Sequence, residues 1–170
     1  MGVVRGSRWL RRMGQGFIIL LGGMAALFLL MQFLVARQQT PSFEQVRSAY
    51  RSSYVNILDR NGQRLQQLRL DFQERRGEWT ALEAASPALQ DALLASEDRR
   101  FYNHHGVDGL ALLGALAKRL SSGYSGGAST ITMQLVGMLD EQLHRQKRSR
   151  SYRQKIKQII MAQALERHWS

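Results

Sequence analysis

The sequence of 170 residues has no cysteine and only two prolines, and these absences exclude several classes of protein. Without cysteine there is no disulfide framework, no thiol nucleophile and no thiolate metal site. Two prolines exclude collagen-like and proline-rich designs. Apolar residues make up 44% of the chain and charged residues 22%, which is the balance of a globular protein. The length is enough for one ordinary domain and a short appendage.

Acidic residues are scarce relative to basic ones, 13 against 24, and the formal net charge is +11. Such an excess indicates an anionic partner: nucleic acid, a phospholipid surface or another phosphate-bearing ligand. The excess is local, because four arginines precede residue 16 and seven Lys or Arg residues occupy the stretch 145–157, with no acid in either segment. The rest of the chain is neutral, so the charge marks two short segments.

Residues 17–36 form an apolar run in which Gln32 is the only strongly polar side chain. A helix of about 20 residues spans roughly 30 Å, the thickness of a bilayer's hydrocarbon core. We therefore predict a transmembrane anchor over 17–36. A cleaved signal peptide is the alternative, although its apolar region is usually only ~7–15 residues long. The preceding arginines favour a cytoplasmic location for the basic tail, residues 1–16, and place the chain after residue 37 on the opposite side.

The remainder divides into a juxtamembrane linker over 37–52 and a mainly helical domain over 53–170. Alternating apolar residues on both sides of a turn at Asp59–Gly62 predict a small β hairpin. Helical periodicity, bounded by cap and stop residues, predicts four helices, over about 87–97, 108–123, 130–139 and 151–168. The residues expected near the buried face of the last helix are Tyr152, Ile156, Ile159, Ile160, Gln163 and Ala164.

A dense polar run, EDRRFYNHHGVD, occupies residues 97–108 between two apolar helices. Acids at the C-terminal end of a helix are electrostatically disfavoured by its dipole, and a carboxylate in such a place suits a general base. A solvated loop with an ion pair between Asp98 and an arginine, closed by an Asp108 N-cap, is the structural alternative. Metal binding by His104 and His105 is disfavoured, because adjacent residues rarely converge on one ion.

Two further segments could carry chemistry. The stretch GGASTITMQL, residues 126–135, is a glycine turn followed by hydroxyls and an amide, and can bring backbone N–H groups and a helix N-terminus to an anionic group. An N-cap at Ser129 or Thr130 is the simpler interpretation. The basic run before and within the last predicted helix could surround a pyrophosphate. For residues 145–150 a solvated face, or one attracted to anionic lipid, fits better.

In this order and spacing, the segments resemble glycosyltransferase family 51, the peptidoglycan glycosyltransferase domain of class A penicillin-binding proteins. Residues 97–108 match its E-D-R-x-F-x-x-H-x-G-x-D motif, and residues 127–134 match its G-x-S-T-x-x-x-Q motif. The likeness covers roughly 54–170. Where the third motif usually reads R-K-x-x-E, this chain has Gln154 and Gln158. The glutamine at 158 and the segment 138–140 resemble the penicillin-binding protein 1C branch.

The resemblance implies a lysozyme-like glycosyltransferase domain, incomplete in this chain, anchored in the bacterial inner membrane and exposed to the periplasm. It implies polymerisation of lipid II onto a nascent glycan strand, with loss of undecaprenyl pyrophosphate and with Glu97 as general base. It further implies that Asp98 and Arg100 brace the base, that His105 and Asp108 fix the loop, and that Ser129, Thr130 and Gln134 position the donor. The candidates for binding the pyrophosphate are Arg153, Lys155 and Lys157, with Gln158 offering an amide where the family has a carboxylate.

The resemblance leaves alternatives open. A divalent cation, Mg2+ or Mn2+, at the pyrophosphate is an option by analogy, but no ligand set in the sequence specifies one. The family continues with further helices beyond the equivalent of residue 170, so the chain reads as an N-terminal fragment. A non-catalytic, membrane-anchored module that binds lipid-linked precursor or glycan is therefore the second hypothesis. Other cell-wall synthesis proteins are candidate partners, whereas nucleic acid is disfavoured by the anchor.

Overall fold

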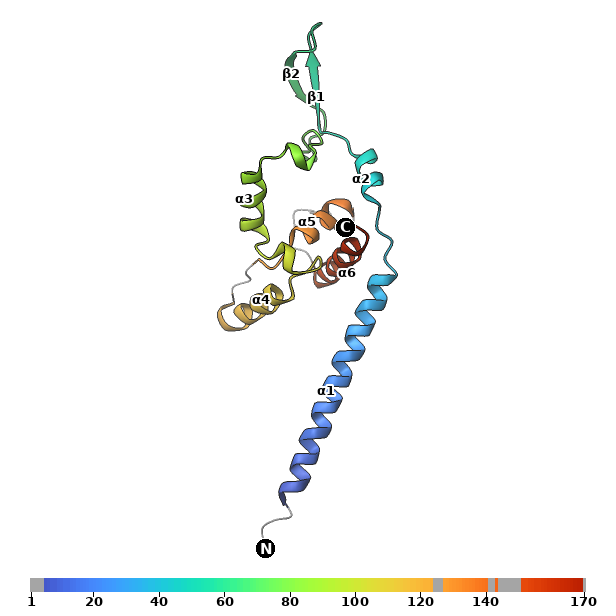
Figure 1. Cartoon of the computed structure of the whole chain (residues 1–170), viewed down its shortest axis with the longest axis vertical. Helices are drawn as coiled ribbons and strands as arrows, with labels where there is room; N and C mark the ends of the chain where they lie inside the picture. Colours follow the sequence, from blue (N-terminus) through green and yellow to red (C-terminus); the bar gives the residue numbers. More distant parts are fainter. Residues whose placement is uncertain (1–4, 124–126, 141–142, 144–150, 170) are drawn as a thin grey trace.

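The computed structural model describes residues 5–123, 127–140, 143 and 151–169, with side chains from residue 12 onward. Over these residues the chain is mainly helical, with one antiparallel pair of strands and an apolar helix at the N-terminus. The predicted fold class is confirmed in these terms. Figure 1 shows the long N-terminal helix extending away from the rest of the chain, with the hairpin at the opposite end of the molecule.

The N-terminal helix, α1 (Arg5–Ala36), is longer than the predicted anchor because it also includes the basic residues that precede the apolar run. Its segment Arg12–Ala36 is the one part of the described chain that is long and apolar enough to cross a membrane. One side of the last turns of α1 is covered by protein. Val35 is only 1% exposed and packs against Ile160 and Ala164 of α6 (Tyr152–His168), beside the end of α1 in Figure 1.

A short helix, α2 (Phe43–Ala49), interrupts the segment predicted to be a linker. Ser42 and Gln45 form a reciprocal capping box at its start, a pattern that sequence reasoning could have used. The segment is also tied to the C-terminal end of α6, because Trp169 Nε1 donates a hydrogen bond to the Pro41 carbonyl at 2.9 Å. This stretch therefore fastens the end of α1 to the domain.

The predicted hairpin is confirmed. Strands β1 (Tyr54–Leu58) and β2 (Arg64–Arg69) pair antiparallel, and an irregularity between Ile57 and Leu58 precedes the turn. Gly62 completes the turn at φ +79°, a conformation that residues with a Cβ rarely adopt. The hairpin lies far from α5 and α6 (Figure 1), and we assign it no part in the site.

The other helices follow the predicted boundaries closely, because each begins at a side chain that caps its N-terminus. They are α3 (Pro87–Glu97), α4 (Gly109–Ser122), α5 (Ile131–Leu139) and α6, capped by Ser86, Asp108, Thr130 and Ser151 respectively. Gly123 ends α4 in the left-handed conformation. Two single 3-10 turns, Leu82–Ala84 and Phe101–Asn103, flank α3.

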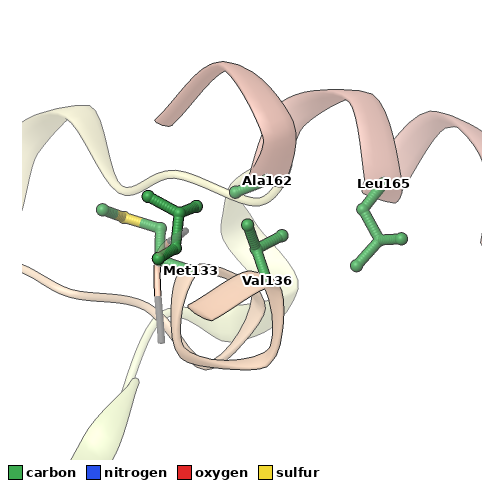
Figure 2. Close-up of a cluster of buried hydrophobic side chains, with 5 residues drawn as sticks. Met133, Val136, Ala162 and Leu165 are labelled. Atoms are coloured by element: carbon green, nitrogen blue, oxygen red, sulfur yellow. The ribbon is translucent and has the colours of Figure 1, made fainter. Parts of the chain in front are cut away.

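The buried core lies between α5 and α6. Met133 and Val136 of α5 meet Ala162 and Leu165 of α6, with Leu143 completing the cluster (Figure 2). The predicted buried face of α6 was wrong at its first turns: Tyr152 is 74% exposed and Ile156 54% exposed. The residues of α6 that are buried are Gln158, Ile160, Ala162, Ala164 and Leu165.

The leucine stripes of α3 and α4 fall on helices as predicted but are not buried. Leu89 and Leu93 of α3 are 62% and 50% exposed. The exposed leucines of α4 are Leu110, Leu113, Leu116 and Leu120. Contiguous exposed apolar surface is a property of interaction surfaces. The described structure gives no partner for these stripes, and the site described below does not depend on them.

Candidate functional site

Glu97 is the last residue of α3, and its carboxylate is held by one residue of α5. Gln134 Nε2 donates a hydrogen bond to Glu97 Oε2 at 2.7 Å. Glu97 is otherwise exposed, so the carboxylate is oriented by an amide and open to a ligand. Because the Gln134 amide is a neutral donor that does not ionise, it orients the carboxylate without adding a charge beside it.

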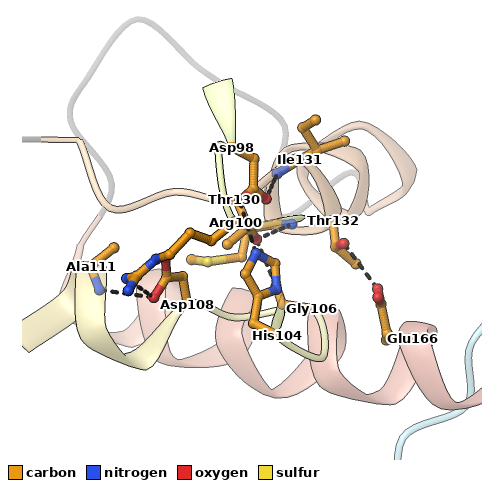
Figure 3. Close-up of polar contacts among 11 residues, drawn as sticks. Asp98, Arg100, His104, Gly106, Asp108, Ala111, Thr130, Ile131, Thr132 and Glu166 are labelled. Atoms are coloured by element: carbon orange, nitrogen blue, oxygen red, sulfur yellow. Dashed lines mark hydrogen bonds and ion pairs between the residues drawn. The ribbon is translucent and has the colours of Figure 1, made fainter. Parts of the chain in front are cut away.

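Asp98, the C-cap of α3, is only 6% exposed and connects the polar loop 98–108 to the start of α5. Its Oδ2 accepts a hydrogen bond from the Ile131 N–H at 3.1 Å, and its Oδ1 lies 2.8 Å from His104 Nε2 (Figure 3). The N-terminus of α5 therefore binds a carboxylate of the protein itself. The sequence suggested an external phosphate there, and the structure assigns that Ile131 N–H to Asp98 instead.

The two adjacent histidines have different positions. The His104 side chain is buried against Asp98, whereas His105 is exposed and lines a hollow with Gln32 and residues of α6. Sequence reasoning gave the loop-fixing role to His105 and missed His104. The signal was present, because the histidine of the quoted motif stands seven positions after its glutamate, which is position 104.

Arg100 and Asp108 close the loop with a two-point ion pair. Arg100 Nε and one terminal nitrogen contact the two Asp108 carboxylate oxygens at 2.8 and 2.5 Å. The same carboxylate caps α4 by accepting from the Ala111 N–H at 2.9 Å. The backbone hydrogen bond and the Arg100 guanidinium hold the pKa of Asp108 below its ordinary value, although burial acts in the opposite direction. Asp108, which the resemblance implied to fix the loop, therefore contacts both Arg100 and the first turn of α4.

An Asp108→Asn substitution tests this linkage. Because the pKa of Asp108 is lowered on folding, its stabilisation is present above the ordinary value of 3.8 and is lost as the pH falls through the folded-state pKa. We expect Asp108→Asn to lower the free energy of unfolding by about 1 kcal/mol at pH 7 and by less at pH 3. Urea unfolding in detergent, followed by circular dichroism, measures both. An equal loss at the two pH values would contradict the assignment.

Thr130 is buried and uses its hydroxyl within the protein. Its Oγ1 donates to the Gly106 carbonyl at 2.6 Å and accepts from the Met133 N–H at 3.2 Å. The resemblance implied that Thr130 positions the donor sugar. With only 2% of its surface exposed, Thr130 is not placed to contact one. Thr130 instead joins the loop 98–108 to α5 at a second point (Figure 3), beside the Asp98 contact.

A contact between Ser129 and Lys155 joins the first turns of α6 to the segment just before α5. Lys155 Nζ donates to Ser129 Oγ at 2.7 Å and lies 3.4 Å from Gln158 Oε1. Gln158 has no exposed surface, and its Nε2 donates to the Met133 carbonyl of α5. A buried amide that donates to one helix and accepts from a lysine satisfies both of its ends, which a carboxylate could not do.

The other predicted cations lie elsewhere on α6. Lys157 forms an ion pair with Asp140, the C-cap of α5, at 2.7 Å. Lys155 and Lys157 therefore contact opposite ends of α5. Arg153 is exposed on the first turn of α6. The basic residues 145–150 lie outside the described part of the chain.

The arrangement places an oriented carboxylate and a lysine at one end of one helix. Ser129 and Gln134, which contact Lys155 and Glu97, are five positions apart in the sequence, one just before α5 and one in its N-terminal half. Both contacts are made at the N-terminal end of α5, which makes Glu97 and Lys155 candidates for one site. Among the described residues, no three acidic or histidine side chains converge to hold a metal ion, so we derive no step through one.

Comparison with known sequences agrees with this reading. The family model described as "Transglycosylase" matches residues 61–170, which include the loop 98–108, α5 and α6. The chain belongs to the transglycosylase family. A "Penicillin-binding protein 1A/1B" of Bacillus subtilis is 28% identical over 143 residues, which cover 81% of this chain and 14% of that protein.

Two shorter relatives are also similar to this transglycosylase chain. A "Monofunctional glycosyltransferase" of Staphylococcus epidermidis is 32% identical over 97 residues, 57% of this chain and 34% of that protein. A "Biosynthetic peptidoglycan transglycosylase" of Rhodospirillum centenum is 46% identical over 56 residues, 33% of this chain and 24% of that protein. In each case the matched part of this transglycosylase chain spans about a third or less of the relative's length.

Proposed function

We propose that the chain carries the catalytic core of a peptidoglycan glycosyltransferase that polymerises lipid II. The observation that carries the proposal is the Glu97 carboxylate, exposed and oriented by Gln134 at the same end of α5 as Lys155. Transfer of a sugar from a pyrophosphate donor requires a base for the attacking hydroxyl and a cation for the leaving pyrophosphate. The family membership and the name of the Rhodospirillum centenum relative support this choice of substrate class.

The proposed reaction is an inverting displacement. The 4-hydroxyl oxygen of the acceptor sugar attacks the anomeric carbon of the donor, and a glycosidic C–O bond forms. The anomeric carbon–oxygen bond to the pyrophosphate breaks, and its electron pair leaves with undecaprenyl pyrophosphate. The hydroxyl proton passes to Glu97. Because the pyrophosphate leaves as a stabilised anion, no second carboxylic acid is needed to protonate it, unlike in a glycosidase.

Lys155 is the proposed partner of the leaving pyrophosphate. Its ammonium group is directed to Ser129 by the buried Gln158, and both groups can donate to a phosphate oxygen. Arg153, exposed on the first turn of α6, is a second candidate for the same anion. We propose that Lys157 acts on the packing of α6 through Asp140 instead of on the substrate.

The amide of Gln158 bears on which branch of the family the chain belongs to. It supports placement in the penicillin-binding protein 1C branch, which the chain resembles in having a glutamine at this position. An amide leaves Glu97 as the single carboxylate proposed to exchange a proton. We further propose that α1 crosses the inner membrane with the N-terminus in the cytoplasm, so that the site faces the polyprenyl substrate from the periplasmic side.

A lysine substitution tests the proposal. Lys155→Gln removes the charge but keeps a hydrogen-bond donor for Ser129, and a hydrogen bond to a charged group is worth about 1.5–3 kcal/mol. We therefore expect lipid II polymerisation to slow by about tenfold to a hundredfold, measured as glycan product from the 170-residue chain in detergent. Lys118→Gln, on the exposed surface of α4, is the charge-matched control and should retain the original rate. Equal rates for the two variants would exclude Lys155 from this role.

The same assay decides between catalysis and binding alone. Binding of a lipid II analogue without any glycan product, by the unmodified chain, would assign it as a membrane-anchored binding module. The neutral Gln158 and the exposed leucines of α3 and α4 are the features that make this second function worth testing. Product formation would exclude it.

A further inference from the structure

A hollow of about 410 Å³ lies where the anchor helix meets the domain, within the size range of small-molecule sites. Its lining comes from three segments: Gln32 from α1, His105 from the loop 98–108, and Gln163, Glu166 and Arg167 from α6. Arg167 donates a hydrogen bond to Gln32 Oε1, so the one polar side chain of the apolar run forms part of the wall. The function proposed above uses none of these side chains.

The hollow is separate from the carboxylate of Glu97. Glu166 accepts a hydrogen bond from Thr132 at 3.0 Å, whereas Glu97 contacts Gln134. Two residues two positions apart on a helix point about 200° away from each other, because each residue turns the helix by about 100°. The hollow and the candidate base therefore lie on different sides of α5.

The anchor places the hollow at the boundary between the hydrocarbon core and the lipid headgroups. The apolar run 17–36 spans roughly 30 Å, so the hydrocarbon core ends near Ala36 and Gln32 lies about one helical turn before that end. Beyond Gln32, Val35 is covered by α6 and no longer needs lipid around it. Figure 1 shows α6 beside this end of α1, and the contact between Arg167 and Gln32 places the end of α6 at the level of Gln32.

The chemistry of the lining combines a cation with two acceptors. Gln163 Oε1 is buried and has no hydrogen-bond partner among the described residues, which is unfavourable unless a ligand supplies a donor. The Glu166 carboxylate is a second acceptor on the same helix. A primary ammonium has three N–H donors for such a pair, and the Arg167 guanidinium is suited to a phosphate.

We propose that this hollow binds the headgroup of a zwitterionic phospholipid that carries a primary ammonium, as in phosphatidylethanolamine. The ammonium contacts Gln163 and Glu166, and the phosphate contacts Arg167. A quaternary choline headgroup has no N–H donor for the Gln163 amide oxygen. An anionic glycerol headgroup has no positive charge to offset Glu166.

Native mass spectrometry of the full chain in detergent tests the proposal with synthetic lipids. The chain is incubated with equal amounts of phosphatidylethanolamine, phosphatidylcholine and phosphatidylglycerol of the same acyl chains. We expect one phosphatidylethanolamine molecule to be retained at least about tenfold more than either of the others, the effect of one charge-assisted hydrogen bond. Equal retention of the three lipids, or preference for phosphatidylglycerol, would overturn the proposal.

Two variants localise the binding to the hollow. Glu166→Gln removes the charge but can still accept from Thr132, and it should abolish the preference for phosphatidylethanolamine over phosphatidylcholine. Arg37 lies at the same end of α1, where its guanidinium stacks on Phe33. The control Arg37→Gln should leave the lipid preference intact. If Glu166→Gln fails to fold by circular dichroism, Gln163→Met replaces it, with the same expected loss. Retention of the preference in a folded hollow variant would contradict the assigned site. The readout is lipid binding, so it does not depend on glycan synthesis.

Discussion

Replacement of Glu97 by glutamine is expected to lower the rate of lipid II polymerisation by about 10²–10⁴-fold, the usual contribution of a general base. The substitution keeps the size of the side chain, and its amide oxygen can still accept from Gln134. It removes only the proposed ability to take the acceptor's proton. The loss should therefore appear in kcat, while KM for lipid II changes little, because binding does not use that proton. Single-turnover assays with labelled lipid II separate the two.

Asp91→Asn is the matched control, since it neutralises an exposed carboxylate on the same helix. It should leave both constants unchanged. Unchanged turnover in Glu97→Gln would remove this residue as the base, whatever the behaviour of the control. A loss confined to KM would instead make Glu97 a substrate-binding residue.

The helix boundaries could be predicted because their signals are local. Ser86 followed by a proline, Asp108, and Gly123 each end or begin a helix through contacts with residues three or four positions away. The buried face of α6 could not be predicted in the same way. It depends on which side meets α5, and there the structure buries the polar Gln158 while it leaves Ile156 exposed. Only a partner such as the Met133 carbonyl makes that burial favourable.

The sequence indicated which residues to consider for the candidate site, but it indicated little of how they are arranged. Motif matching selected Glu97, Gln134 and Lys155, which the structure brings to one end of α5. It did not show that Thr130 is buried or that Lys157 pairs with Asp140 at the other end of α5. These outcomes depend on how two helices cross, which no spacing along one chain specifies.

The leucine stripes of α3 and α4 illustrate the same limit. Periodicity correctly marks an apolar face, but it does not name the surface that covers it. The described chain leaves Leu93 half exposed and Leu120 81% exposed. In contrast, the contact between α1 and α6 is specific, because Val35 and Ala164 are both almost fully buried there.

A Gly106→Ala substitution is expected to destabilise the domain by about 2–5 kcal/mol. Gly106 has a φ of +77°, where a residue with a Cβ costs about 1–2 kcal/mol. An added Cβ would also lie 2.6 Å from the Ala162 carbonyl oxygen, and overpacking of this kind costs about 1–3 kcal/mol. The obstacle is backbone of α6, so it cannot move aside as the end of a flexible side chain would. Urea unfolding of the detergent-solubilised chain measures the loss.

Gly123→Ala is the matched control, because it carries the same kind of backbone strain at φ +67° with no atom within 4 Å of the added Cβ. It should lose only about 1–2 kcal/mol. The difference between the two variants isolates the contact between the loop 98–108 and α6. Because the Gly106 carbonyl accepts the Thr130 hydroxyl, moving Gly106 should also displace the start of α5 and slow glycan synthesis in Gly106→Ala alone. Equal destabilisation of the two variants would mean that the loop does not pack against α6 this closely, and would remove the physical basis for a preformed site.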